Sequence, residues 1–564
     1  MKIAFVVPRY GLEIVGGAEY HARQVAEHLK EDHEIEVLTT CAKDYHTWKN
    51  EYKSGTESIN GIFVRRFKNT KVRDINRHRW IEERVFYSYH DKHNEINWVK
   101  SQGPYSKELI KYIENNKNLY DCFIFFTFRY YPSYYGIQLV GYKSLLAPLA
   151  ENDPALDLQI TKEMFESSKG IVYNTPEERK LVLTKGGFRE EEKIWDIVGC
   201  GIEMPMITKA SESLMDKDYI LYLGRIDGSK GCYTLFEYYQ KVLNEFEDVP
   251  DLVLVGYDAI GTPKNDKIRY LGFVSEEEKF SLLRDAKFLI MPSPYESLSL
   301  VTLEAMASGI PALVNGECDV LKGHCIRSNA GLWYQNYDEF RECLNLLSSN
   351  EKLRGKMGEN GKKYVEENYS WKNVAEKYLR LLEKMADSAL ENITFSALEV
   401  GSFDYRKFPL KLNLGCGFDK RGGYLNVDFQ DFHKPDLVAD IRNLNMLPSD
   451  TYDEILAQDC LEHLPLIDID ICLEEWYRLL KAGGKLKLRI PNLIGLLHLL
   501  EDKQSFEEQK ELIHYLFGTQ AYEGDYHLSG FTNLVTEHYL KETGFININF
   551  TSKDQWLFEI TCEK

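Results

Sequence analysis

Short apolar runs alternate with helical stretches along almost the whole chain, and no other feature of the sequence restricts the fold as strongly. Residues 2–8 (KIAFVVP) have the composition of a buried strand, and residues 16–31 have the apolar spacing of an amphipathic helix. The succession continues to about residue 200, starts again at residue 218 and starts a third time at residue 410. Because strands that alternate with helices form parallel sheets with covering helices, the sequence predicts an α/β protein.

The three series define the expected domains. We expect a first domain over residues 1–200 and a second over residues 201–386, which ends in a helical stretch that starts near Tyr369. Residues 387–408 hold no long periodic pattern and are predicted to be a linker. A third domain is expected over residues 409–564. A chain of this length is too long for a single core, which agrees with several domains.

Composition excludes several classes of protein. The net charge is -19, so the surface as a whole does not attract nucleic acid. The 11 cysteines include no CxxC pair, which suits a reducing cytosol better than a disulfide scaffold or a zinc site. The N-terminal residues predict a strand and a turn rather than a signal peptide, and no apolar run reaches the ~18 residues that span a bilayer. We expect a cytoplasmic protein, and a peripheral contact with the inner membrane face is compatible with the sequence.

Two cations follow the first strand of the second domain. In residues 221–231 (LYLGRIDGSKG), Arg225 and Lys230 lie in a glycine-containing turn between a strand and a helix. The planar fork of an arginine and the point charge of a lysine together neutralise a diphosphate. Taken alone, the turn is also compatible with a solvated basic loop.

Two glutamates follow in residues 292–313 (PSPYESLSLVTLEAMASGIPAL), where Glu296 and Glu304 are the only charged side chains. Carboxylates accept hydrogen bonds from hydroxyls, so Glu304 suits a ribose diol and Glu296 suits the hydroxyls of a sugar. The helix between them offers its N-terminus to the same diphosphate as the two cations. The sequence therefore predicts a cleft that binds a nucleotide sugar.

Residues 1–386 resemble the retaining glycosyltransferases of family 4, which have the GT-B fold. The resemblance rests on Gly16-Gly17 before the first helix, GRIDGSKG at 224–231, LGFV at 271–274 and the Glu-x7-Glu pair. Taken alone, the two glycines are equally compatible with a purely conformational role. The resemblance implies two Rossmann-like domains that face a cleft, with the acceptor mainly on the first and the nucleotide-diphosphate sugar mainly on the second. It also implies a terminal helix that crosses back to the first domain.

The resemblance also implies roles for single residues. Arg225 and Lys230 are expected to bind the diphosphate, Glu304 the ribose and Glu296 the donor sugar. The remaining positions implied to contact the donor are Gly16, Gly17, Val274, Ser297, Leu298 and Ser299.

The sequence departs from that family at two positions. The Gly-Phe-Gly that often follows the first glutamate is replaced by Ser297, Leu298 and Ser299, so the donor sugar does not carry over. The first-domain region that holds a histidine in many members has none, and its polar candidates are Arg129, Tyr130, Glu151 and Asp153. In a same-face displacement the departing phosphate oxygen takes the acceptor proton, and fixed cations stabilise the leaving diphosphate. With no convincing Asp-x-Asp in these domains, we expect no metal.

An irregular stretch at residues 64–93 mixes arginine, lysine, histidine and aromatic residues. It is compatible with a wall of the acceptor site that stacks on sugar rings or meets a lipid diphosphate. A solvated insertion is the alternative interpretation.

The third series begins with a strand, a Gly-Cys-Gly turn and a second strand that ends in an acid. Gly415 and Gly417 let a ligand press against the backbone, and Asp428 suits a ribose diol. With Asp440 before Ile441, residues 409–564 resemble class I S-adenosyl-L-methionine-dependent methyltransferases. The resemblance implies Gly415 and Gly417 at the methionine part, Asp428 at the ribose, and Asp440 with Ile441 beside the adenine. Only ten residues separate Gly417 from Asp428, so the usual first helix must be shortened or replaced by a loop.

Methylation of a hydroxyl needs a general base within hydrogen-bond reach. His463 and His527 are the candidates, with Asp459 near the first, although each histidine also suits a purely structural hydrogen bond. Cys416 and Cys460 are expected to pack as small apolar groups.

The leading hypothesis is a bifunctional enzyme of surface polysaccharide biosynthesis. It transfers a sugar with retention to a glycan, glycolipid or glycoprotein acceptor, and it methylates the same or a neighbouring glycan. The alternative is a glycosyltransferase whose third domain only binds or scaffolds. A GT-B phosphorylase is disfavoured, because nothing identifies a lysine that would bear a pyridoxal cofactor.

Overall fold

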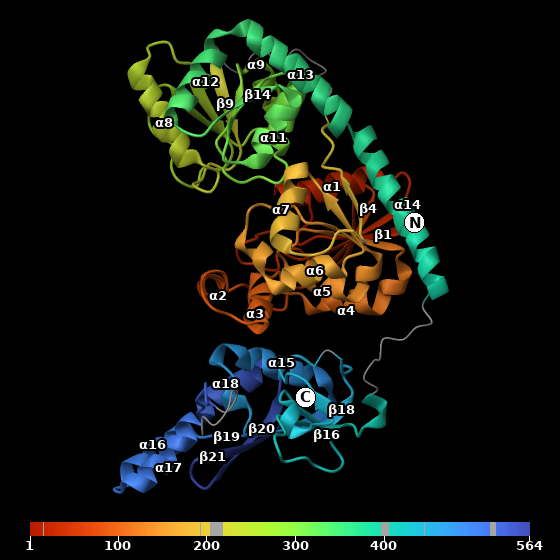
Figure 1. Cartoon of the computed structure of the whole chain (residues 1–564), viewed down its shortest axis with the longest axis vertical. Coiled ribbons are helices and arrows are strands. Elements are labelled where there is room, and N and C mark those ends of the chain that lie inside the picture. Colours follow the sequence, from red (N-terminus) through yellow and green to blue (C-terminus); the bar gives the residue numbers. More distant parts are fainter. Residues whose placement is uncertain (15, 192, 204–217, 396–404, 445, 519–525) are drawn as a thin grey trace. The chain divides into compact units, whose positions relative to one another are not determined.

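The computed structural model describes residues 1–564 except 15, 192, 204–217, 396–404, 445 and 519–525 (Figure 1). Its internal contacts divide the chain into two compact units, Met1–Phe395 and Ser396–Lys564. The α/β prediction is confirmed, because each of the three sheets is built mainly from parallel strands. Within the described part, no helix is both long and apolar enough to cross a membrane.

The first sheet has eight strands in the order β3-β4-β2-β1-β5-β6-β7-β8. β3 is antiparallel to β4, and the other pairs are parallel. Apolar side chains of β1 and β5 are fully buried, as expected of strands covered on both faces. The strands are β1 (Lys2–Val6), β2 (Glu34–Thr40), β3 (Gly55–Ile59), β4 (Ile62–Phe67), β5 (Cys122–Phe126), β6 (Ser144–Ala147), β7 (Gly170–Tyr173) and β8 (Ile194–Ile197). The helices are α1 (Gly17–Leu29), α2 (Ile75–Tyr87), α3 (Lys92–Gln102), α4 (Lys107–Asn116), α5 (Tyr131–Val140), α6 (Gln159–Ser167) and α7 (Pro176–Gly186).

The second sheet has six parallel strands in the order β11-β10-β9-β12-β13-β14. Two apolar clusters cover its two faces. The strands are β9 (Tyr219–Leu223), β10 (Asp251–Val255), β11 (Ile268–Gly272), β12 (Leu289–Met291), β13 (Ala312–Asn315) and β14 (Gly331–Tyr334). The helices are α8 (Cys232–Glu245), α9 (Glu276–Asp285), α10 (Leu300–Ser308), α11 (Asp319–Ser328), α12 (Tyr337–Ser349) and α13 (Glu351–Tyr369).

The last helix of the first unit, α14 (Trp371–Phe395), returns from the second sheet to the first (Figure 1). Its buried residues belong to the core of the first sheet, and Lys377 Nζ donates to the carbonyl oxygen of Ile197 at 2.9 Å. Residues 387–395, which were expected in the linker, continue this helix because no glycine or proline stops it. Part of the predicted linker, residues 396–404, lies outside the described residues.

The second unit holds one seven-stranded sheet in the order β17-β16-β15-β18-β19-β21-β20. β21 is antiparallel to both of its neighbours, and the other pairs are parallel. The structure has no helix among residues 415–424, so the short connection between the first two strands is a loop as predicted. The strands are β15 (Lys411–Leu414), β16 (Leu425–Asp428), β17 (Leu437–Val438), β18 (Tyr452–Gln458), β19 (Leu480–Pro491), β20 (Ile546–Lys553) and β21 (Leu557–Glu563). The helices are α15 (Ile469–Leu479), α16 (Leu493–Asp502), α17 (Phe506–Phe517) and α18 (Asn533–Thr543).

We predict that Leu381→Ala lowers the free energy of unfolding of the first unit by about 2–5 kcal/mol, because Leu381 is 1% exposed in the first-sheet core. Urea unfolding of the full chain, followed by tryptophan fluorescence, measures the change. Glu383→Ala, on the exposed side of the same helix, is the matched control. Equal midpoints for both variants would show that α14 does not stabilise this core.

Candidate functional site

The turn between β9 and α8 carries both predicted phosphate ligands. Asp227 organises it: one carboxylate oxygen accepts from the backbone N–H of Lys230 at 3.0 Å, and the other pairs with Arg225. Arg225 also reaches the first-sheet domain, since its Nη1 donates to the hydroxyl of Tyr45 at 2.8 Å. The guanidinium is 41% exposed, so an anion from solvent has access to it.

Gly231 brings this turn against the end of β12. Its φ is +75°, and a Cβ there would lie 2.2 Å from the carbonyl oxygen of Pro292. Only glycine meets both conditions. The close approach places Lys230 beside the predicted sugar ligand, with Lys230 Nζ 2.7 Å from Glu296 Oε1. The carboxylates of Glu296 and Glu151 raise the pKa of Lys230, against the opposing effect of burial.

Hydrogen bonds to its backbone carbonyl oxygens hold the turn Ser297–Leu298–Ser299 in place. Ser299, the N-cap of α10, has a φ of +62°. The carbonyl oxygen of Leu298 accepts from His324 Nε2 at 2.8 Å, and that of Ser297 accepts from Thr175, the N-cap of α7, at 3.3 Å. Burial lowers the pKa of His324 to about 3, so the ring stays neutral and donates to one partner. Sequence reasoning missed His324, because a single histidine on a helix gives no signal.

Glu304 has a different cation as its partner. Its carboxylate accepts from Lys279 Nζ of α9 at 2.8 Å and is 9% exposed. Burial raises the pKa of Glu304, and Lys279 opposes the shift. Burial and the Glu304 carboxylate both raise the pKa of Tyr20 on α1, so Glu304 lies near the first-sheet domain. Val274, the predicted base contact, packs against the core of the second sheet.

The two glycines at the start of α1, the N-cap Gly16 and the first helical residue Gly17, differ in their surroundings. A Cβ on Gly16 would lie 2.2 Å from a carboxylate oxygen of Glu19, which pairs with Arg9 at 2.7 Å. A Cβ on Gly17 would meet nothing within 4 Å. Arg9 also lies over the ring of Tyr45, 5.3 Å from its centroid. Gly16 is therefore required by its close contact with Glu19. Gly17 borders open space near the contacts that link Arg9, Tyr45 and Arg225.

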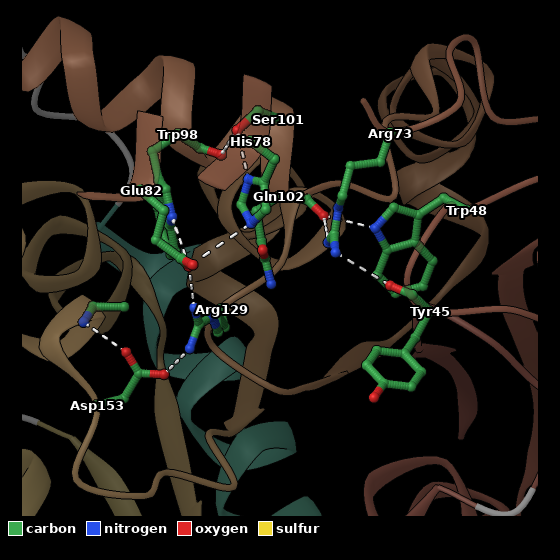
Figure 2. Close-up of polar contacts among 11 residues, drawn as sticks. Tyr45, Trp48, Arg73, His78, Glu82, Trp98, Ser101, Gln102, Arg129 and Asp153 are labelled. Carbon is green, nitrogen blue, oxygen red and sulfur yellow. Dashed lines mark hydrogen bonds and ion pairs between the residues drawn. The ribbon is translucent and has the colours of Figure 1, made fainter. Parts of the chain in front are cut away.

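Three of the four polar candidates of the first domain, Arg129, Tyr130 and Asp153, make contacts within that domain. Arg129 pairs with Asp153 and with Glu82 of α2, and Trp98 donates to the same Glu82 at 3.4 Å (Figure 2). Tyr130 packs against Trp48, with ring centroids 5.4 Å apart. These contacts give both Arg129 and Tyr130 a structural role.

Glu151 interacts electrostatically with Lys230 and Glu296. It stands in a hollow that solvent enters, yet the surrounding protein and the charge of Glu296 raise its pKa to about 7, while Lys230 acts in the opposite direction. The structure thus brings Glu151, Lys230 and Glu296 into one electrostatic group.

A hollow of about 330 Å³ adjoins this group. The basic-aromatic stretch predicted as an acceptor-side wall contributes to it through α2, and the second-sheet domain contributes Tyr295. Tyr295 is 47% exposed, so its ring is available for stacking. The lining residues are Arg79, Glu82, Glu83, Phe86, Tyr87, Arg129, Glu151, Asn152, Asp153, Pro154 and Tyr295.

In the second unit, the Gly-Cys-Gly turn follows β15. Gly415 and Gly417 have φ of +61° and +49°. A Cβ on Gly415 would lie 2.5 Å from Cys460, whereas a Cβ on Gly417 would meet nothing within 4 Å. Asp428 accepts from the backbone N–H of Gly417 at 2.8 Å and from His433 Nδ1 at 3.0 Å. Asp428 therefore fixes the backbone of the Gly-Cys-Gly turn, and the space beside the Cα of Gly417 is open.

The other predicted cofactor contacts lie after β17. Asp440 is 38% exposed and pairs with Arg442 at 2.8 Å. Ile441 is buried in the core, and its carbonyl oxygen accepts from Trp476 at 3.0 Å. Cys416 and Cys460 are buried thiols, and burial raises the pKa of Cys416 to about 11.

The two candidate general bases, His463 and His527, are in contact. The rings of His463 and His527 lie edge to face with centroids 4.8 Å apart, and Glu462 is beside them. Burial raises the pKa of Glu462 to about 8. Asp459, which is near His463 in the sequence, pairs with Arg489. The sequence did not single out Glu462, because one acid next to a histidine carries no signal.

Two family models match the chain. Residues 205–364 match Glycosyl transferases group 1, and residues 415–488 match Methyltransferase domain. The chain joins a group 1 glycosyltransferase domain to a methyltransferase domain. The first match contains Arg225, Lys230 and both glutamates of the predicted donor cleft, and the second contains the glycine turn and Asp428.

Relatives and solved structures agree with the glycosyltransferase domain. An uncharacterized glycosyltransferase of Methanocaldococcus jannaschii is 26% identical over 411 residues, which cover 66% of this chain and 96% of the relative. The O-antigen chain mannosyltransferase B of Escherichia coli is 29% identical over 194 residues, which cover 32% of this chain and 49% of that protein. A trehalose-6-phosphate structure from E. coli bound with UDP-2-fluoro glucose has a TM-score of 0.50 at 12% identity and covers 67% of this chain and 98% of that one. The glycosyltransferase part therefore has the GT-B fold.

Proposed function

We propose that the protein is a retaining glycosyltransferase that takes a sugar from a nucleotide-diphosphate donor, coupled to a methyltransferase that uses S-adenosyl-L-methionine. The observation that carries the first half is the contact of Lys230 with Glu296, beside an arginine that joins the two domains. In this contact Lys230, a cation suited to phosphate, is hydrogen-bonded to Glu296, a carboxylate suited to sugar hydroxyls.

The donor half follows from these charges. A diphosphate has acceptor oxygens for the remaining N–H groups of Lys230 and for the exposed guanidinium of Arg225. The bond between the anomeric carbon and the phosphate oxygen breaks as the acceptor oxygen attacks from the same face. The departing phosphate oxygen takes the acceptor proton, and the two cations stabilise its charge. The E. coli structure bound with UDP-2-fluoro glucose supports a nucleotide sugar as the donor.

The acceptor half rests on the hollow that α2, Glu151 and Tyr295 line. An exposed aromatic ring among carboxylates suits a hydroxylated ring, which has apolar faces and polar edges. The similarity to the O-antigen chain mannosyltransferase B of Escherichia coli supports a glycan acceptor. A lipid-linked or protein-linked glycan, and a peripheral contact with a membrane, fit the basic and aromatic residues of α2.

The second unit extends the proposal to methylation. Gly417 leaves space for the methionine part of S-adenosyl-L-methionine, and Asp428 and Asp440 offer acceptors for its ribose and adenine. When bound, this cofactor supplies the methyl group. In this proposal His463 or His527 takes the proton of the acceptor hydroxyl. Fusion of the two enzymes keeps a newly added sugar at high effective concentration for the second site.

One observation favours the alternative, a methyltransferase-like domain that only binds or scaffolds. Both carboxylate oxygens of Asp428 already accept hydrogen bonds from the protein, which reduces its capacity for a ribose diol.

The proposed location is the cytoplasm. All eleven cysteines, each in the described part of the chain, are thiols, which supports a reducing compartment. Surface polysaccharide biosynthesis is the proposed context.

Loss of either phosphate ligand should lower turnover. We expect Arg225→Ala and Lys230→Ala each to reduce the release of nucleoside diphosphate by roughly 10²–10³-fold, because each removes a cation from the leaving group. A panel of nucleotide sugars identifies the donor first, and circular dichroism checks folding. Arg341→Ala and Lys241→Ala, which remove exposed ion pairs on α12 and α8, are the matched controls. Full activity in both test variants would overturn the phosphate assignment.

The raised pKa of Glu151 predicts a pH dependence. Below a pH of about 7 its carboxyl is protonated, and above it the carboxylate accepts a hydrogen bond from a sugar hydroxyl. We therefore expect kcat/KM to rise with pH through about 7, and Glu151→Gln to remove this rise. Asp157→Asn, which removes an exposed acid paired with Lys185, is the control. A rise that survives unchanged in Glu151→Gln assigns it to another group.

Binding of S-adenosyl-L-methionine separates the two forms of the proposal. Gly417→Asn keeps a residue type that tolerates φ of +49° while it projects a side chain into the open side of the turn. Calorimetry on the full chain should show binding to the wild type and to Gly483→Asn, a matched open glycine with φ of +75°, but not to Gly417→Asn. No binding to the wild type supports the scaffold alternative. Equal binding to both variants would place the cofactor elsewhere.

A further inference from the structure

One group of side chains in the second unit has the composition of a metal site. Glu462, His463 and His527 each offer a ligand atom, and these atoms all lie within 4.8 Å of one another. Two imidazoles and a carboxylate are the donor set of catalytic zinc sites and of other divalent transition-metal sites. Ligands about 2.1 Å from one ion lie roughly 3.4 Å apart in a tetrahedral site, so atoms within 4.8 Å of one another must approach by at most about 1.4 Å to hold an ion.

The buried acid of this group has an unsatisfied oxygen. Glu462 is 1% exposed, and its Oε2 has no hydrogen-bond partner in the described structure. A buried carboxylate oxygen without a partner is costly, and such a group calls for a missing ligand. A cation between Glu462 and the two histidines would satisfy it.

The surrounding hydrogen bonds orient one ligand. His463 Nδ1 lies 3.1 Å from the carbonyl oxygen of Tyr526, which can only accept. Nδ1 must therefore carry the proton, and the lone pair of the neutral ring is on Nε2. A histidine that donates from one nitrogen to a backbone carbonyl and binds metal with the other is the usual arrangement around metal ions.

The backbone holds the two segments of the group together. The N–H groups of Leu528 and Ser529 both donate to the carbonyl oxygen of Glu462, at 2.8 and 3.1 Å. These bonds join the short helix of Leu461–His463 to the loop that carries His527. Asp459 stays outside the donor set because it pairs with Arg489.

We propose that Glu462, His463 and His527 bind a divalent transition-metal ion such as Zn²⁺, with at least one coordination position open to an oxygen ligand. The site adjoins the predicted cofactor turn, since the Cβ position of Gly415 is 2.5 Å from Cys460. The binding itself does not depend on methyl transfer.

A role for the ion in methylation rests on the proposed function. The ion binds the acceptor hydroxyl and lowers its pKa, as bound cations do for water. The hydroxyl proton leaves to solvent, the oxygen forms a bond to the methyl carbon, and the bond from that carbon to sulfur breaks. The two histidines are then ligands rather than bases.

Metal content tests the site. The full chain, with any affinity tag removed, is stripped with a chelator, incubated with Zn²⁺ and freed of excess ion by gel filtration. Mass spectrometry of the metal should find about one Zn²⁺ per chain in the wild type and in His498→Gln, the control at an exposed histidine of α16. In His463→Gln and His527→Gln the affinity should fall by at least about tenfold. Glu462→Gln should behave in the same way if circular dichroism shows that it folds.

Two further results separate the site from other causes. The absorption spectrum with Co²⁺ should lack the near-ultraviolet charge-transfer bands that binding to a cysteine thiolate would give. No Zn²⁺ retained by the wild type, or retention unaffected by both histidine variants, overturns the proposal. Because these measurements need no methyl transfer, a failure of the proposed methyltransferase activity leaves their outcome unchanged.

Discussion

The contact between Lys230 and Glu296 is the interaction on which the proposed donor site depends. It joins the turn after β9 to the turn after β12, so two loops from neighbouring strands act as one surface. The fold makes the contact possible through Gly231, whose missing side chain lets the first loop reach Pro292. Lys230 is held by the carboxylates of Glu296 and Glu151. A bound phosphate would take over part of their interaction with the Lys230 ammonium group.

The sequence was sufficient for the architecture, and the reason is physical. Parallel strands covered on both faces must be apolar throughout, and runs such as residues 122–126 show this directly. Glycines with positive φ are also visible in the sequence as turn residues. Gly231, Gly415 and Gly417 occupy turns where other residues would be strained. The end of α14 was less predictable, because residues 387–395 show no long periodic pattern of apolar residues.

The site was predictable only in part. Arg225, Lys230 and Glu296 stand in recognisable turns, and two of them meet in the structure. The partners of Glu304 and Asp428 were not predictable, because Lys279 and His433 come from neighbouring segments with no pattern of their own. The same holds for Glu151 and for the group around Glu462: long-range packing decides their electrostatic environment, and single-sequence patterns record only local spacing. Their roles stay proposals.

The packing of α14 determines where the methyltransferase unit is tethered. The helix starts at the second sheet, but its buried residues from Val374 to Met385 belong to the first-sheet core, and the chain leaves the first unit beyond that point. A hinge motion between the two sheets of the first unit would therefore leave the start of the second unit attached to the first-sheet domain.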